Sequence, residues 1–458
     1  MARPIFLALL ATFFVRPARA DLIGASGAYQ KGDYATAYHD FRELAELGQP
    51  TAQYDLAVMY YRGEGTRQSE IYAYAWASLA AQNGLEKAKT LAQKLRPLLA
   101  PGSEKVAADI AGQFGNAVLD ARLNPKIVEG EAASLGDPHR CYPLGSYPDD
   151  LYPPEAVRKG IEGQVYIEFT LMPDGRSRMP RIIYAVPQGM FDSATRKALL
   201  HSEFAPAAAG QPPRPCTVFF NFQLRGATAR DYPRLNVFVK ETLTRAERGD
   251  PGAQMLYGML LVGLPQLKKP RSEALPWFLK SAQAGTPLAQ FQVGYSLLKG
   301  WGCDCDVNKG LDWLRRAAQA GQPAAEVTLA MYALRGNPDE ERLRQAKLWL
   351  EQAAASGDRD GKLYLAALLA ASAGEQARDS KRALNLVNEV FRGVDDDPTA
   401  YEIRAAAQAD GGDFKAAFSS ENKALWLAEK LKWDLTPMDD RMAHYKAKQP
   451  WYGTLLEF

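Results

Sequence analysis

A period of 36 residues constrains the fold of this chain more than any other feature. Glycine, tryptophan, alanine and small residues all recur at this spacing in the second half of the sequence. The positions are Gly249, Gly285, Gly321, Gly357 and Gly393; Trp277, Trp313 and Trp349; Ala282, Ala318 and Ala354; and Gly258, Gly294, Ala330 and Ala366. Gly48 and Gly84, with Trp76 and Ala81, repeat the pattern near the N-terminus. A fixed period of this length is the signature of stacked structural repeats.

Each repeat predicts a pair of antiparallel helices. Apolar residues recur at three and four positions in the segments that begin at Ala289 and Gly310, as amphipathic helices require. The small residue in the first helix allows a neighbouring helix to approach, the tryptophan fills the space between repeats, and the closing glycine suits a left-handed C-cap. Because one such pair cannot bury its apolar face alone, the pairs are expected to stack into a solenoid.

The repeats resemble the Sel-like family, which is related to the tetratricopeptide repeats. The matching residues are Ala52, Leu56, Tyr60, Gly63, Gly65, Ala73, Trp76, Ala80, Ala81 and Gly84 in one repeat, and Ala289, Gly294, Tyr295, Gly300, Gly302, Trp313, Ala317, Ala318 and Gly321 in another. The pattern is specific over about 231–360 and weakens over 361–430. The resemblance implies protein–protein scaffolding through variable residues of a concave face, while the repeated residues hold the solenoid together.

A different domain is predicted between about 130 and 230, where the period vanishes. Residues 165–171 alternate between apolar and more polar side chains, although Tyr166 makes the second face only partly polar. Asp174-Gly175 is typical of a turn, 181–186 of a returning strand, 191–201 of a helix and 216–224 of a last strand. We therefore expect a small α+β domain inserted into the solenoid.

The inserted segment resembles the C-terminal domain of TonB. The residues that carry the resemblance are Tyr152, Pro153, Ala156, Gly160, Gly163, Asp174, Gly175, Phe191, Asp192, Phe204 and Pro206. The family binds an extended peptide, the TonB box of an outer-membrane receptor, at a sheet edge by β-augmentation. The resemblance implies a peptide site on the last strand, at Val218, Phe219, Phe220, Asn221, Phe222, Gln223 and Leu224. The alternative is a structural insert whose edge is covered by the adjoining repeats.

The first twenty residues predict a cleaved secretory signal. Arg3 precedes an apolar run over 5–15, and Ala18 and Ala20 flank Arg19 as at a cleavage site. A retained anchor is the alternative, but eleven helical residues reach only about 16 Å against roughly 30 Å of hydrocarbon. No later stretch approaches eighteen apolar residues, so no stable membrane span is expected after cleavage. TonB itself has a membrane helix and a proline-rich spacer that this chain lacks, which argues against a force-transducing role.

The four cysteines are disulfide candidates, because an exported chain meets oxidising conditions. Cys141 precedes the TonB-like motif and Cys216 opens its last strand, so we expect these two to pair. Cys303 and Cys305 lie in a turn of one repeat. A bridge between them would be tight, and a redox or metal pair is the functional alternative.

Composition and motifs favour a protein without catalytic activity. The formal net charge of +2 gives no reason to expect nucleic acid as a partner. The histidines His39, His139, His201 and His444 are scattered, and no zinc spacing, nucleophile elbow or phosphate loop is present. We predict no metal and no cofactor. The acidic runs Asp149-Asp150 and Asp395-Asp396-Asp397 suit solvated turns, and Asp397-Pro398 suits a helix start.

The sequence thus predicts a mainly α-helical solenoid with an inserted α+β domain. The expected parts are a signal peptide (1–20), N-terminal repeats (21–130), the TonB-like domain (131–230), C-terminal repeats (231–436) and an aromatic tail (437–458) that caps the last repeat or docks a partner. The expected function is a periplasmic, non-enzymatic scaffold in a Gram-negative bacterium. Its partners would be periplasmic or outer-membrane proteins. The alternative is an accessory or energy-transducing component of TonB-dependent outer-membrane transport. The sequence does not define the oligomeric state.

Overall fold

The computed structural model describes residues 22–128, 141–145, 151–206, 211–222, 232–264, 267, 269, 271–336, 338–372, 378–391 and 397–456. The predicted signal peptide, Gly393, His139, Gln223 and Leu224 lie outside these residues. The chain divides into two compact units. One unit runs to Glu46 and takes in Pro50–Ala107, and the other comprises Leu47–Gln49 and everything from Ala108 onward.

The first unit consists of helices that pack in chain order. They are α1 (Leu22–Gln30), α2 (Tyr34–Glu46), α3 (Pro50–Arg62), α4 (Glu70–Gln82), α5 (Glu86–Leu95), a short 3-10 helix (Arg96–Leu98) and the start of α6 (Ser103–Gly112). Each of the helices α1 to α5 contacts the next one along the chain. Leu56 on α3 and Trp76 on α4 are buried between them. Ser69 caps α4 by accepting a hydrogen bond from the Tyr72 amide.

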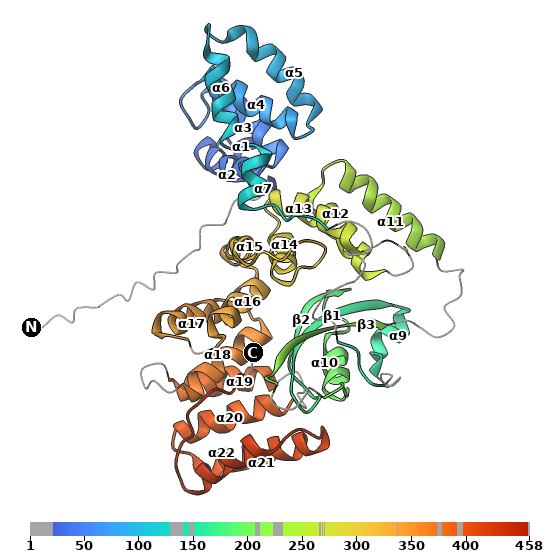
Figure 1. Ribbon diagram of the computed structural model, residues 1–458, viewed down its shortest axis with the longest axis vertical. Helices are drawn as coiled ribbons and strands as arrows, with labels where there is room; N and C mark the ends of the chain where they lie inside the picture. The colour runs from blue at the N-terminus through green and yellow to red at the C-terminus, as the bar shows by residue number, and fades with distance from the viewer. Residues whose placement is uncertain are drawn as a thin grey trace, which may run out of the picture. The chain divides into compact units, whose positions relative to one another are not determined.

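The second unit is a solenoid of helix pairs with a small sheet beside it (Figure 1). After α7 (Asn116–Arg122), its helices are α11 (Tyr232–Glu247), α12 (Pro251–Gly263), a 3-10 turn (Arg271–Glu273), α13 (Ala274–Gln283), α14 (Pro287–Lys299), α15 (Val307–Gln319), α16 (Pro323–Leu334), α17 (Glu340–Ala355), α18 (Arg359–Ala371), α19 (Ser380–Phe391), α20 (Pro398–Asp410), α21 (Phe414–Lys430) and α22 (Thr436–Lys446). The mainly α-helical solenoid with an inserted α+β domain is confirmed.

The roles predicted for the repeated glycines are also confirmed. Gly249, Gly285, Gly321 and Gly357 follow the second helix of each pair with φ between 81° and 90°, which disfavours a side chain. Gly294 on α14 lies against α15, because a Cβ at this position would come within 2.9 Å of the Gly310 carbonyl oxygen. Close helix packing therefore requires glycine here.

Trp313 shows how a repeated tryptophan acts in the solenoid. Its ring is fully buried, and its Nε1 donates a hydrogen bond of 2.8 Å to the carbonyl of Leu123. The indole thus ties α15 to the chain that follows α7, in addition to filling space.

The inserted domain is a three-stranded antiparallel sheet in the order β2-β1-β3. The strands are β1 (Gly163–Leu171), β2 (Ser177–Val186) and β3 (Arg214–Phe222), and the helices are α9 (Pro154–Lys159) and α10 (Asp192–Leu200). One face carries Val165, Ile167 and Phe169 into a core with α9 and α10. This alternation is the one that the sequence predicted.

The second face of the sheet differs from the expectation of a partly polar surface. Tyr166, Tyr184 and Phe219 pack with side chains of α12 and α14, and Gln164, Glu168 and Thr170 are buried as well. The repeats cover this face, so β1 is buried on both sides.

The C-terminal tail folds back on the last repeats. Tyr445 is buried against Ala405 and Ala417, and Leu456 packs with residues of α18 to α20. The Gly453 amide donates to the Ala371 carbonyl at 2.9 Å. Phe458 lies outside the described residues. Within the residues that the structure describes, no helix combines the length and the hydrophobicity needed to cross a bilayer.

Candidate functional site

The residues of the TonB-like motif hold the inserted domain in shape. The Tyr152 hydroxyl donates to the Ile161 carbonyl at 2.6 Å, and its ring packs edge-on against Phe191. Gly163 has no room for a Cβ, which would come within 2.4 Å of Phe191 and of the Val186 carbonyl. Gly175 has a φ of 82° and packs against the Phe204 carbonyl. These contacts support the sheet rather than expose side chains to a ligand.

Most of the other motif residues also hold the inserted domain in shape or connect it to the last repeat. Gly160 is the left-handed C-cap of α9, and Pro153 is its N-cap. Asp174 accepts hydrogen bonds from the amides of Arg176 and, in the last repeat, Asp434. Pro206 follows Phe204, whose backbone pairs with Pro143. Asp192, at the start of α10, is the exception, since its carboxyl lines a groove described below.

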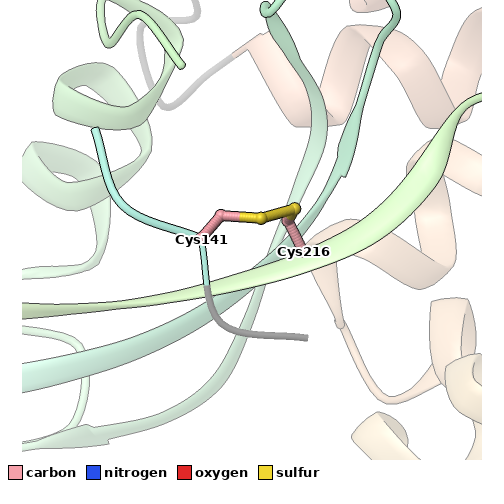
Figure 2. The surroundings of a disulfide bond; sticks show 2 residues. All are labelled: Cys141 and Cys216. Atoms are coloured by element: carbon pink, nitrogen blue, oxygen red, sulfur yellow. A yellow bond between two sulfur atoms is a disulfide. The ribbon is translucent and has the colours of Figure 1, made fainter. Parts of the chain in front are cut away.

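The strand order leaves β2 and β3 at the two edges of the sheet. The sequence-predicted peptide site is the β3 edge, which β1 pairs on one side from Arg214 to Phe222. On the other side, the Cys141 amide donates to the Thr217 carbonyl at 2.9 Å. A disulfide between Cys141 and Cys216 fixes this contact (Figure 2), with the Cα atoms 5.6 Å apart. The predicted pairing of these cysteines is confirmed.

The direction of the Thr217 carbonyl defines which residues of β3 face outward. In an antiparallel ladder, alternate residues direct their amide and carbonyl groups to the same side. Since the backbone carbonyl of Thr217 points away from β1, the backbone amide and carbonyl groups of Phe219 and Asn221 do so too. Asn221 is exposed, whereas the side chains of Val218, Phe219, Phe220 and Phe222 are buried. At its C-terminal end, the β3 edge therefore presents Asn221, with an outward backbone and an exposed side chain.

The β2 edge borders a groove with a volume of about 1070 Å³. One wall is the second half of β2 with Pro187 and Gln188, together with α10. The opposite wall comes from the repeats: α12, the first residues of α16 and α18, and the end of α19. Nothing in the sequence periodicity signals this groove, because it forms only where the inserted sheet meets the solenoid.

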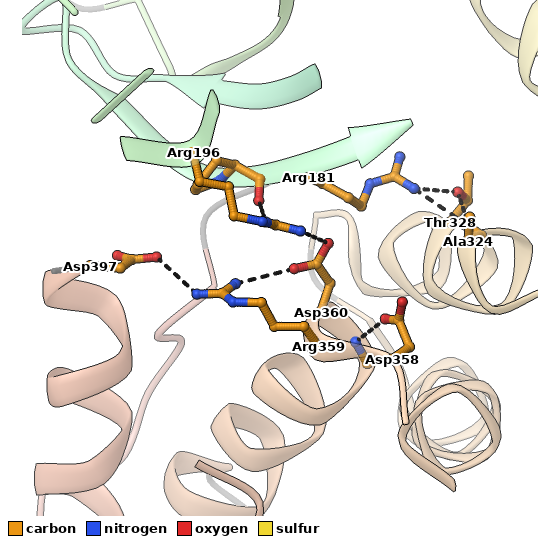
Figure 3. A network of polar contacts seen from close by, with 10 residues as sticks. Arg181, Arg196, Ala324, Thr328, Asp358, Arg359, Asp360 and Asp397 are labelled. Atoms are coloured by element: carbon orange, nitrogen blue, oxygen red, sulfur yellow. Dashed lines mark hydrogen bonds and ion pairs between the residues drawn. The ribbon is translucent and has the colours of Figure 1, made fainter. Parts of the chain in front are cut away.

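A network of arginine and aspartate side chains crosses the groove (Figure 3). Arg196 of α10 pairs with Asp360 of α18 at 3.1 Å and donates to the Pro180 carbonyl of β2. Arg359 contacts Asp360 at 3.3 Å and Asp397 at 4.0 Å. Asp397 does not lie in a solvated turn as predicted, because it is buried as the N-cap of α20. Burial alone would raise the pKa of Asp360, but Arg196 and Arg359 outweigh it and lower the pKa. The Asp360 carboxylate is therefore ionised and paired with both arginines.

A buried ion cluster attaches the sheet to the repeats. Glu168 on β1 pairs with Arg181 on β2 and with Lys299 on α14, and all three side chains are at most 7% exposed. Arg181 also donates to the Thr328 hydroxyl at 2.7 Å. Burial favours neutral Glu168, but the two cations outweigh this effect and hold its pKa well below the usual range. Sequence reasoning missed this cluster, because its members lie up to 131 residues apart.

The candidate bridge between Cys303 and Cys305 does not form, since both cysteines are free. The Cys303 side chain is buried, where burial raises its pKa to about 12, whereas Cys305 is exposed and its Sγ approaches the Leu298 carbonyl. The two side chains thus lie in different surroundings. Among the described residues, no group of three or more metal-ligating side chains comes together.

The comparisons with known proteins agree with this architecture. The family model "Gram-negative bacterial TonB protein C-terminal" matches residues 148–224, and the Sel1 repeat model matches 50–85, 251–286, 287–322 and 323–358. The chain therefore carries Sel1 repeats and a TonB C-terminal domain, as the sequence predicted. Protein TonB of Pseudomonas aeruginosa is 34% identical over 104 residues, which cover 22% of this chain and 30% of that protein.

Two solved structures of Sel1-type proteins are also similar. A Sel1 repeat protein from Oxalobacter formigenes is 20% identical, with a TM-score of 0.33, and the match covers 44% of this chain and 85% of that one. The protein c5321, a protective antigen of uropathogenic Escherichia coli, is 15% identical, with a TM-score of 0.35 and coverage of 93% and 78%.

The domain content indicates a protein-interaction scaffold. Sel1 repeats and TonB-like domains are typically non-enzymatic and bind other proteins. Similarity to TonB points to a protein of the Gram-negative envelope.

Proposed function

We propose that the protein is a periplasmic, non-enzymatic scaffold that binds an extended segment of a partner at the β3 edge. Residues 1–20 direct export and are removed. The repeats at 21–130 and 231–436 hold one protein partner, and the domain at 131–230 holds a segment of another. The partners are periplasmic or outer-membrane proteins of a Gram-negative bacterium.

The observation that carries this proposal is the edge position of β3. The described residues give the strand one ladder partner, β1, and its last outward-facing residue, Asn221, is exposed. A peptide strand added here would form backbone hydrogen bonds, which provide affinity in β-augmentation. Because Cys141 already occupies the Thr217 carbonyl, the proposed binding window is the C-terminal end of the strand, around Asn221. The buried neighbours of Asn221 fix the strand, so the edge is rigid before binding.

The test is titration of the full chain with fluorescent TonB-box peptides. Asn221→Pro removes an outward amide without removing a hydrogen bond to β1, so we expect it to weaken binding about tenfold or more. Ala185→Pro, on the β2 edge, is the matched control and should leave this binding unchanged. Unfolding temperatures verify that both variants fold. Equal affinity of Asn221→Pro and the original chain would contradict binding at β3.

The similarity to TonB favours an accessory or energy-transducing role in outer-membrane transport as a second candidate. This role needs a membrane connection at the N-terminus. N-terminal sequencing of the protein from fractionated cells separates the two: residue 1 retained in the membrane fraction supports transduction, and a start at residue 21 in the periplasmic fraction supports the scaffold.

A further inference from the structure

The β2 edge differs from the β3 edge because a walled groove lies alongside it. The second half of β2, from Ile182 to Val186, lines the groove, and two prolines limit the edge at Pro180 and Pro187. Proline is tolerated at sheet edges because it lacks only an outward amide. The open stretch between the prolines is therefore short and defined.

The backbone of Ala185 faces into this groove. The backbone carbonyl of Thr217 points away from β1, so the amide and carbonyl of its β1 partner, Glu168, point toward β2. The backbone groups of Tyr166, two residues earlier on β1, point toward β2 as well. The pairing of Tyr166 with Tyr184 then turns the amide and carbonyl of Ala185 outward. The Pro180 carbonyl, which accepts from Arg196, also faces outward and agrees with this assignment. Within the described residues, Ala185 has no backbone partner across the groove.

The charges of the groove define what it would accept. Its ion pairs join Arg196 and Arg359 to Asp360, and Lys362 to Glu389 at 2.8 Å. Two lining carboxyls, Asp192 and Asp358, form no ion pair with any described residue. The Oδ1 of Asp192 is buried without a hydrogen-bond partner, which is costly.

The surroundings of these two carboxyls favour a ligand with a positively charged group. Burial raises the pKa of Asp192, although Arg196 and the Gly189 backbone oppose it. Burial also raises the pKa of Asp358 to about 6; Asp360 adds to the effect, and Arg196 is too distant to form an ion pair that cancels it. A carboxyl that is hard to ionise when buried gains most from an added positive charge. Lys197, the remaining cation of the lining, is exposed.

We propose that the groove is a second peptide site, in which an extended segment of a partner pairs with β2 around Ala185 and places a lysine or arginine beside Asp192 and Asp358. The segment adds a strand at the usual spacing of about 4.8 Å from β2, between the sheet and the first residues of α16 and α18. The basic side chain supplies the specificity that the β3 edge, with its buried side chains, lacks. The inference uses the same physics as the proposed function but a different edge and different residues.

The test compares nine-residue peptides in which threonine and valine alternate around a central lysine, glutamine or glutamate. Each is titrated against the full chain by fluorescence anisotropy. We expect the lysine peptide to bind about tenfold tighter than the glutamine peptide, and the glutamate peptide to bind weakest. The double variant Asp192→Asn, Asp358→Asn should remove the preference, since asparagine keeps the shape and the cap of α18. Glu340→Gln, an exposed carboxyl on α17, is the matched control and should keep it.

Proline variants locate the site and separate this inference from the proposed function. Ala185→Pro should weaken the lysine peptide about tenfold, while Asn221→Pro should not. Loss of all binding in Asn221→Pro alone overturns the inference and leaves binding at β3 intact. A charge preference that survives the double asparagine variant overturns it too. A dimer of the full chain that Ala185→Pro dissociates would assign the groove to a second copy of the protein and would also overturn it.

Discussion

Removing the carboxylate of Glu168 should detach the sheet from the repeats. In Glu168→Ala, Arg181 and Lys299 remain as two buried cations without their shared partner. Breaking a buried ion pair from one side costs about 3–5 kcal/mol, because the remaining charge is uncompensated. At about 1.4 kcal/mol for each factor of ten, the opening of β1 should become roughly 10²- to 10⁴-fold more frequent.

Hydrogen exchange of the β1 amides measures this opening directly. A global unfolding curve is less suitable, because a chain of two compact units need not unfold in one step. Glu155→Ala is the control, since it removes an exposed pair with Lys159 on α9 and should change little. If β1 exchanges at the same rate in the two variants, the reasoning that the buried cluster secures the sheet is refuted.

The same carboxylate predicts a pH dependence. The pKa of Glu168 is lower in the folded protein than its ordinary value of 4.5, because Lys299 and Arg181 outweigh the effect of burial. Its contribution to stability is therefore complete above about pH 4.5 and is lost as the pH falls toward the folded value. The difference in the hydrogen-exchange protection of the β1 amides between the original chain and Glu168→Ala should shrink below that pH. A constant difference down to pH 3 would contradict the ionised state assigned to Glu168.

Two further predictions concern the disulfide and the repeats. The double variant Cys141→Ser, Cys216→Ser opens a loop with a sequence separation of 75 and should cost about 4 kcal/mol, seen as a lower urea midpoint for the sheet, and the reductant dithiothreitol should reproduce the loss in the original chain. An unchanged midpoint would show that the bridge contributes nothing. Gly294→Ala should cost about 1–3 kcal/mol, because the added methyl group meets the Gly310 carbonyl, whereas Gly112→Ala has open space and should be neutral or slightly stabilising. Equal unfolding temperatures for the two alanine variants would contradict the close packing of α14 and α15.

Local patterns were enough to predict the solenoid and the order of the inserted domain. Gly285 and Gly321 specify helix ends through backbone conformation, and Gly294 specifies a close approach, so each acts within one repeat. Asp174-Gly175 and the alternation around Val165 act within one hairpin. Such signals depend on a few neighbouring residues and are therefore visible in a single sequence.

Contacts between distant segments could not be predicted in this way. Glu168 resembles a solvent-facing residue of an alternating strand, and only the arrival of Lys299 from α14 makes it a buried ion partner. The groove beside Ala185 likewise depends on Asp358, which lies several repeats further along the sequence. The different surroundings of Cys303, which is buried, and Cys305, which is exposed, also depend on how that turn packs.

The central claim is that the sheet receives an added strand from a partner. Hydrogen exchange of the full chain, with and without a saturating TonB-box peptide, tests it most directly. We expect the Asn221 amide, which faces outward on β3, to exchange more slowly with peptide, while amides that already pair with β1 stay unchanged. Unchanged exchange at both Asn221 and Ala185, under conditions where the peptide is bound, would show that binding does not use a sheet edge and would contradict the claim.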